Sequence, residues 1–180
     1  MNKAINFIAS QLLWLLSVSG AANGMAWLGP AFFLLFAAWQ LHPARRASGD
    51  LKLVLIALPL GLLVDSTMAA TGLATYASPG PLGWLAPLWI LTLWMGFALT
   101  FNHSAAILLR RAHLAITFGA IGGPLSYWVA QQAWGAIEFT SPAWPALLLL
   151  GLLWGGAMGL LSLACRRYAA PASVLRTLET

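Results

Sequence analysis

Hydrophobic and polar positions alternate along this chain in long blocks: six apolar segments are separated by short turns rich in Gly, Pro, Asn or charged residues. An apolar helix of about 20 residues is long enough to cross the hydrocarbon core of a bilayer. We therefore predict membrane-spanning helices near residues 4–21, 25–42, 51–71, 84–109, 112–131 and 143–165. The first segment has some features of a signal peptide, but polar residues interrupt it, and we interpret it as a retained helix.

Positive charge occurs only at alternate ends of these segments. The Lys and Arg residues are Lys3, Arg45, Arg46, Lys52, Arg110, Arg111, Arg166, Arg167 and Arg176. The turns around residues 20–24, 71–83 and 131–143 contain none of them. Loops rich in Lys and Arg stay in the cytoplasm. The pattern predicts an all-α membrane protein, a bundle of six transmembrane helices in three hairpins with both termini cytoplasmic.

Composition limits the class of protein further. With 61% hydrophobic and 7% charged residues, the chain lies far from the roughly 25% charged residues of soluble domains. We expect one transmembrane domain over residues 1–170 and a short cytoplasmic tail over 171–180. The net charge of +5 is spread as pairs at helix ends, which favours contact with anionic lipid headgroups over nucleic acid. The single cysteine excludes an internal disulfide and a thiolate metal cluster.

Asp65 is the only acidic residue inside a predicted span. It lies about 20 Å along its helix from Lys52, past the midplane, where a lipid-facing carboxylate costs about 2.5–3.5 kcal/mol. Asp65 should therefore face the protein interior or a wet cavity. Tyr127 and Trp94 lie at a comparable depth. We predict that Tyr127 donates a hydrogen bond to Asp65 and that Trp89 and Trp94 form aromatic walls around this polar pair. Such a group could be a proton carrier, a general base, a ligand anchor or a structural clasp.

Two neighbouring features bear on this predicted pocket. The sequence Gly122-Gly123-Pro124 predicts a break in the fifth helix near mid-membrane, because proline removes a backbone donor. Glu138 belongs to the turn that follows this helix. We expect Glu138 either to cap the cavity over Asp65 or to be an ordinary solvated acid.

A second polar cluster is predicted nearer the cytoplasmic side. Asn102 and His103 lie about 10 Å along the fourth segment from Arg110, and the first segment brings Asn6 and Gln11 to a similar depth. His103 could be a metal or haem ligand, an acid/base, or a buried hydrogen-bonded histidine, and the sequence offers it no carboxylate at matching depth. The chain has no His-rich or paired-acid motif, so we expect no metal site and no cofactor.

Small residues repeat every fourth position in the last segment, at Gly151, Gly155 and Gly159. Such a stripe lets membrane helices approach closely. It predicts either packing within the chain or a homo-oligomer through these glycines.

Several of these motifs together resemble a known family. They are Asn6 with Trp14, Gly61-Leu62-Leu63-Val64-Asp65, Ala86-Pro87-Leu88-Trp89-Ile90, Trp94-Met95-Gly96-Phe97, Asn102-His103-Ser104 and Gly122-Gly123-Pro124-Leu125-Ser126-Tyr127 with Gly135-Ala136. The combination resembles bacterial inner-membrane proteins catalogued as domain of unknown function 2878, over most of residues 5–140. The resemblance implies a compact multi-span protein of the bacterial inner membrane. The family's occasional proximity to fatty-acid-modifying enzymes suggests lipid chemistry.

Three functions fit the sequence. The first is an accessory membrane protein that binds a lipid or another small apolar molecule around Asp65. The second is a small proton-linked transporter that uses Asp65, and the third is an intramembrane enzyme acting on acyl chains. The expected partners are membrane lipids and a small apolar ligand.

Overall fold

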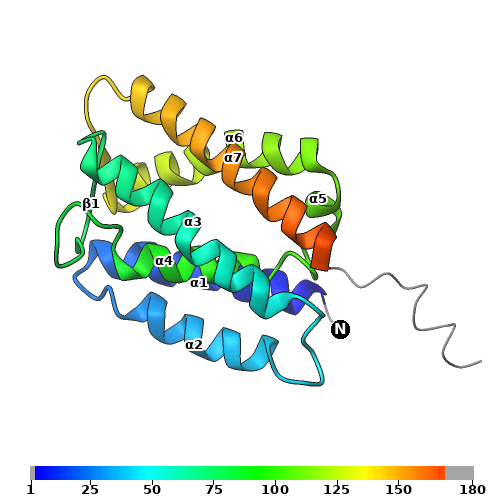
Figure 1. The fold of residues 1–180 in the computed structure, drawn as a ribbon. Helices are drawn as coiled ribbons and strands as arrows, with labels where there is room; N and C mark the ends of the chain where they lie inside the picture. Colours follow the sequence, from blue (N-terminus) through cyan, green and yellow to red (C-terminus); the bar gives the residue numbers. More distant parts are fainter. Residues whose placement is uncertain (1–2, 169–180) are drawn as a thin grey trace, which may run out of the picture.

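A computed structural model describes residues 3–168 of the protein, and the predicted tail over 171–180 lies outside the described residues. The described part forms helices and one pair of short strands (Figure 1). In chain order they are α1 (Lys3–Ala22), α2 (Leu28–Gln40), α3 (Asp50–Ala70), β1 (Ala74–Tyr76), α4 (Leu88–Ala98), α5 (Ala106–Arg110), α6 (Ala112–Trp134), β2 (Ile137–Phe139) and α7 (Trp144–Tyr168). The mostly helical architecture expected from the apolar blocks is confirmed.

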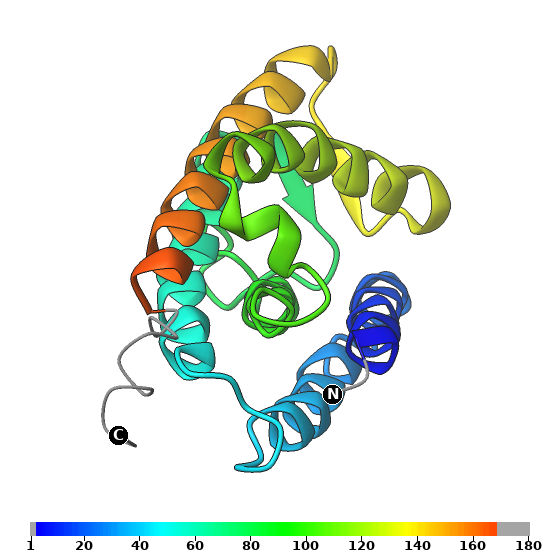
Figure 2. The same cartoon turned by 90° about the vertical axis from the view of Figure 1, so that its right-hand side faces the viewer.

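Helix α4 lies in the middle of the molecule, surrounded by the other helices (Figure 2). It begins after Pro87, whose backbone is extended, and only its first residue, Leu88, is exposed. A predominantly apolar helix is stable in this position because most of its residues are buried against protein.

The predicted continuous fourth span over 84–109 is wrong. The helix ends at Ala98, a series of turns follows over residues 99–105, and α5 forms a separate short helix. The physical reason lies in the polar segment Asn102-His103-Ser104. Its side chains bond to Asp50 and Asn6 on other helices, and the backbone turns to bring them there.

The predicted break at Gly122-Gly123-Pro124 is also wrong, because α6 runs through Pro124 as one helix. Proline at this position leaves the carbonyl of Ala120, four residues earlier, without its helical donor. Gly151 of α7 lies directly against that carbonyl, since a Cβ on Gly151 would be 2.9 Å from the Ala120 oxygen. Close packing by α7 thus covers the carbonyl that proline leaves unpaired.

The glycine stripe of α7 is used within the chain. Gly155 faces Ala120 and Ile116 of α6, and Gly159 faces Ile116 as well. The absence of side chains at these positions lets the two long helices pack backbone to backbone. The stripe itself is therefore occupied by α6.

The strands β1 and β2 form an antiparallel pair that sequence analysis did not predict. Thr75 pairs with Glu138, and Tyr76 pairs with Ile137. Alternate residues of a strand face opposite sides, so Tyr76 and Ile137 are buried while Thr75 and Glu138 are exposed. The pair joins the loop after α3 to the loop after α6 at one end of the bundle.

Three helices, α1, α3 and α7, are long and apolar enough to cross a membrane. Helices α2 and α4 are apolar but shorter, with 13 and 11 residues. Large apolar side chains are exposed around the outside of the bundle, among them Leu35 (69%), Leu63 (62%), Ile121 (63%) and Leu152 (75%). So much exposed apolar surface is typical of a protein that meets lipid or a partner.

Candidate functional site

Asp65 is completely buried and is held by three hydrogen-bond donors from three different elements. Tyr127 of α6 donates to its Oδ1 at 2.5 Å, and Tyr76 of β1 donates to the same oxygen at 3.0 Å. The indole Nε1 of Trp94 in α4 donates to Oδ2 at 2.7 Å. The expectation that Asp65 faces protein beside Tyr127 and Trp94 is confirmed. We call Asp65, Tyr76, Trp94 and Tyr127 the tyrosine cluster.

Trp94 reaches Asp65 because α3 carries a glycine one turn earlier. Residues four apart lie on the same face of a helix, so Gly61 and Asp65 both face α4. The Trp94 ring lies directly on Gly61, where an added Cβ would overlap the ring. The missing side chain makes room for the indole, and the carboxylate one turn further on receives its N–H.

The same arrangement occurs on α6, where Gly123 precedes Tyr127 by one turn. The Trp154 ring of α7 lies on Gly123, where a Cβ would be 2.5 Å from the ring. Trp154 also stacks on Trp94, with ring centroids 4.1 Å apart and an interplanar angle of 29°. Two Gly–Trp contacts and one indole stack therefore connect α3, α4, α6 and α7 through the centre of the molecule.

Tyr76 is the member of the cluster that sequence analysis missed. The sequence predicts a turn over residues 71–83, which include Tyr76. Its contact with Asp65 depends on how the β1–β2 pair folds over the end of α3. The sequence feature that could have pointed to Tyr76 is the small number of tyrosines, three in all. Two of them donate hydrogen bonds to Asp65. Burial, followed by the charge of Asp65, raises the pKa of the Tyr76 phenol well above its ordinary value of 10.0.

A cavity of about 450 Å³ lies beside the tyrosine cluster. It is enclosed mainly by α1, α4 and α6, and its lining residues are Ser10, Gln11, Leu13, Trp14, Val18, Trp89, Ile90, Leu93, Trp94, Phe97, Phe118, Gly122, Gly123, Leu125, Ser126, Tyr127, Val129, Ala130, Ile137 and Trp154. Trp94 and Tyr127 thus face both Asp65 and the cavity, whereas Asp65 itself is not part of the lining. A mostly apolar cavity of this size with a few polar groups is typical of a small-molecule site.

The other two residues predicted for this site have different positions. Trp89 is buried and lines the cavity, but its indole donates to the carbonyl of Ala77 rather than to Asp65. Glu138 lies on the exposed side of β2, and its strand neighbour Ile137 lines the cavity instead. Glu138 therefore does not line the cavity, which favours the second of its two predicted roles, an ordinary solvated acid.

A second buried carboxylate, Asp50, lies at the start of α3. Its Oδ2 is 2.8 Å from His103 Nε2 and accepts from the backbone N–H of Ala47 at 2.8 Å. Its Oδ1 accepts from Asn102 at 2.8 Å. The expectation that His103 has no carboxylate partner at matching depth is therefore wrong. Asp50 lies one residue before the predicted span 51–71, and it forms the first, buried residue of α3.

Two more side chains complete this group. Asn6 of α1 donates to Gln40 of α2 at 2.8 Å, and Gln40 Nε2 lies 3.0 Å from His103 Nε2. The ring nitrogen can donate to Asp50 when it carries a proton or accept from Gln40 when it does not. We call Asn6, Gln40, Asp50, Asn102 and His103 the histidine cluster. It connects α1, α2 and α3 with the turns after α4.

Gln11 does not belong to the histidine cluster, although it was predicted there with Asn6. Residues five apart point in different directions from a helix, and only Asn6 of the two is buried. Gln11 is exposed and lines the cavity. Within residues 3–168, no group of three or more His, Cys, Asp or Glu side chains is arranged to hold a metal ion.

Within residues 3–168, fold and site together define a mostly helical protein with three helices suited to a membrane and an apolar cavity beside a buried carboxylate held by three hydrogen bonds. A family model described as "Protein of unknown function (DUF2878)" matches residues 3–160. The chain belongs to this family, and the resemblance found in the sequence is confirmed. No match was found among curated proteins or among solved structures.

Proposed function

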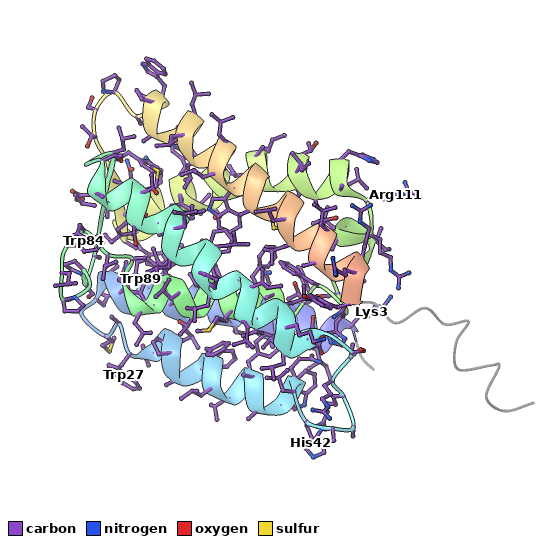
Figure 3. The ribbon with its side chains drawn as sticks, viewed as in Figure 1. Lys3, Trp27, His42, Trp84, Trp89 and Arg111 are labelled. Atoms are coloured by element: carbon purple, nitrogen blue, oxygen red, sulfur yellow. The ribbon has the colours of Figure 1, made fainter. Side chains whose placement is uncertain are left out.

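We propose that the protein is a multi-pass protein of the bacterial inner membrane with six membrane-crossing segments and both termini in the cytoplasm. The distribution of side chains along the bundle supports this orientation. Lys3, His42 and Arg111 lie at one end, and Trp27 and Trp84 lie at the other (Figure 3). Basic residues are enriched at the cytoplasmic surface and tryptophan at the headgroup level. The short α2 and α4 then cross the bilayer together with their flanking turns.

Reporter fusions test this topology. We expect reporters fused after Arg46, Arg111 and Arg167 to indicate the cytoplasm, and reporters fused near Pro79 and Ser141 to indicate the periplasm. The reason is that the loops of the first group carry the Lys and Arg residues. A periplasmic signal at Arg111 would contradict the six-segment arrangement.

We further propose that the protein binds a membrane lipid or another small apolar molecule in the cavity between α1, α4 and α6, as an accessory to lipid metabolism. The observation that carries this proposal is the cavity itself, with a volume of about 450 Å³ and walls of aromatic and aliphatic side chains. Such walls can hold an apolar molecule by close van der Waals packing, which drives association inside a bilayer where the hydrophobic effect does not.

Asp65 supports the cavity rather than facing it. Its hydrogen bonds fix Trp94 and Tyr127, and both of these side chains line the cavity. Proton-linked transport through Asp65 has less support, because the carboxylate is 0% exposed and its oxygens are occupied by three donors. Catalysis by Asp65 on an acyl chain in the cavity has less support for the same reason.

The cavity can be filled from α6 without disturbing the backbone. The atoms nearest to a Cβ added at Gly122 belong to the ring of Phe118, at 3.6 Å or more, which is ordinary van der Waals contact. We expect the wild-type protein, purified in mild detergent, to carry a lipid or apolar molecule that native mass spectrometry detects, and Gly122→Leu to lose most of it. Gly156→Leu is the matched control, because a Cβ there meets nothing within 4 Å and Gly156 does not line this cavity. Equal occupancy in both variants would contradict the proposal.

A further inference from the structure

Gln11 is the one residue of the cavity wall that is both strongly polar and exposed. Its amide N–H donates to Ser10 Oγ over a long 3.4 Å, and its carbonyl oxygen accepts no hydrogen bond from any residue that the structure describes. It lies about 12 Å from Lys3 along α1, well inside the segment proposed to cross the bilayer. An amide facing hydrocarbon there is unfavourable without a partner, so the position favours a polar group next to Gln11.

The rest of the wall restricts what that polar group can be. None of the described residues that line the cavity is Lys, Arg, His, Asp or Glu. The hydroxyls of Ser10, Ser126 and Tyr127 already donate to Phe7, Gly123 and Asp65 respectively. The indole N–H of Trp154 has no hydrogen-bond partner among the described residues, and it is a neutral donor. A carboxylate or phosphate placed here would be a charge without a counter-charge, which a low-dielectric environment strongly disfavours.

Resting on the proposed function, we propose that the occupant is an uncharged lipid from the bilayer with a hydroxyl or carbonyl group, and that Gln11 hydrogen-bonds this group. The chain or ring system of the lipid lies against the aromatic wall formed by residues such as Trp14, Trp94 and Phe118. A neutral amide has both a donor and an acceptor, so Gln11 can bind either a hydroxyl or a carbonyl. Long-chain alcohols and neutral acyl or isoprenoid lipids have this chemistry, whereas free fatty acids and phospholipid headgroups do not.

Three radiolabelled probes with the same chain length separate these possibilities: hexadecan-1-ol, hexadecane and palmitate, the last measured at pH 8. Binding is measured on the full chain in detergent micelles. We expect hexadecan-1-ol to bind about three- to tenfold tighter than hexadecane, the range of one net hydrogen bond, and palmitate to bind more weakly than hexadecan-1-ol. Gln11→Leu should bring hexadecan-1-ol down to the level of hexadecane without changing hexadecane binding.

The matched control is Gln132→Leu, which replaces another exposed glutamine that does not line the cavity. It should leave all three affinities unchanged. An unchanged alcohol-to-alkane ratio in Gln11→Leu, or palmitate binding as tight as that of the alcohol, would overturn the inference about Gln11 while hexadecane binding still supported the cavity. Failure of both uncharged probes to bind, or binding that Gly122→Leu does not reduce, would overturn the proposed function itself.

Discussion

The two buried carboxylates of this protein are nearly equal in exposure, at 0% for Asp65 and 1% for Asp50, and yet they have different surroundings. Asp65 is surrounded by aromatic donors, two of which also form the cavity wall. Asp50 bonds to an imidazole, an amide and a backbone N–H, none of which belongs to a residue that lines the cavity. Burial therefore does not distinguish their roles, but their partners do.

The hydrogen-bonding partners of the two carboxylates also differ in whether another partner lies within reach. The donors to Asp65 lie in the apolar centre. Among the described residues, Trp94 and Tyr127 have no other acceptor, and Tyr76 has only the backbone carbonyl of Asp65, at 3.5 Å. By contrast, His103, one of the partners of Asp50, also has Gln40 Nε2 within 3.0 Å. The tyrosine cluster should therefore respond more strongly to the loss of its acid than the histidine cluster does.

The largest expected effect comes from Asp65→Ala. It leaves the buried donors Trp94 and Tyr127 without an acceptor and Tyr76 with only the backbone carbonyl of residue 65, at 3.5 Å. We expect a loss of about 3–5 kcal/mol in the free energy of unfolding, because each unsatisfied buried donor costs about 1–3 kcal/mol.

Asp50→Ala should cost less, about 1–3 kcal/mol, because the ring of His103 can instead accept from Gln40 Nε2, which is 3.0 Å away. Reversible unfolding in detergent measures both. A larger loss for Asp50→Ala would reverse the comparison.

A smaller effect is expected from Asp65→Asn. An amide can accept the Trp94 N–H through its oxygen and donate to the two tyrosine hydroxyls, but their own protons then lose an acceptor. We expect a loss of about 1–3 kcal/mol, a folded protein, and less bound lipid by native mass spectrometry because Trp94 and Tyr127 are less firmly held. Unchanged stability would show that the donors are satisfied without a carboxylate.

The smallest effect, and one that depends on pH, is expected from Tyr76→Phe. At pH 7 the loss of one of three donors to Asp65 should cost about 1–2 kcal/mol. The raised pKa of Tyr76 in the folded protein means that its contribution is complete below pH 10 and is lost as the pH rises through the folded value. The midpoint temperature of thermal unfolding should decrease as the pH is raised above about 10. The decrease should be less steep in Tyr76→Phe than in the wild-type protein.

The control for this experiment is Glu138→Gln on the neighbouring strand. Its side chain is exposed and lies outside the cavity wall, so it should change stability by less than about 0.5 kcal/mol. A pH profile of Tyr76→Phe identical to the wild-type profile would show that Tyr76 is not the group that titrates.

Much of the fold could be predicted from the sequence because helix length and depth are local properties. The predicted segments 4–21, 51–71, 112–131 and 143–165 match α1, α3, α6 and α7 to within three residues at each end. A rise of 1.5 Å per residue was enough to place Asp65, Trp94 and Tyr127 at one depth. The pattern of apolar segments and charges therefore determined both the helical class and the central contact of the site.

The tertiary structure alone decided what depended on rotation about a helix axis and on the path of the loops. Gln11 and Asn6 lie at a similar depth, but their side chains point in different directions from α1. Gln11 therefore lines the cavity, whereas Asn6 belongs to the histidine cluster. The turn that ends α4 exists because His103 bonds to Asp50, a residue 53 positions away. The contact between Tyr76 and Asp65 likewise requires the β1–β2 pair. Such contacts form only when distant segments meet, so no local pattern encodes them.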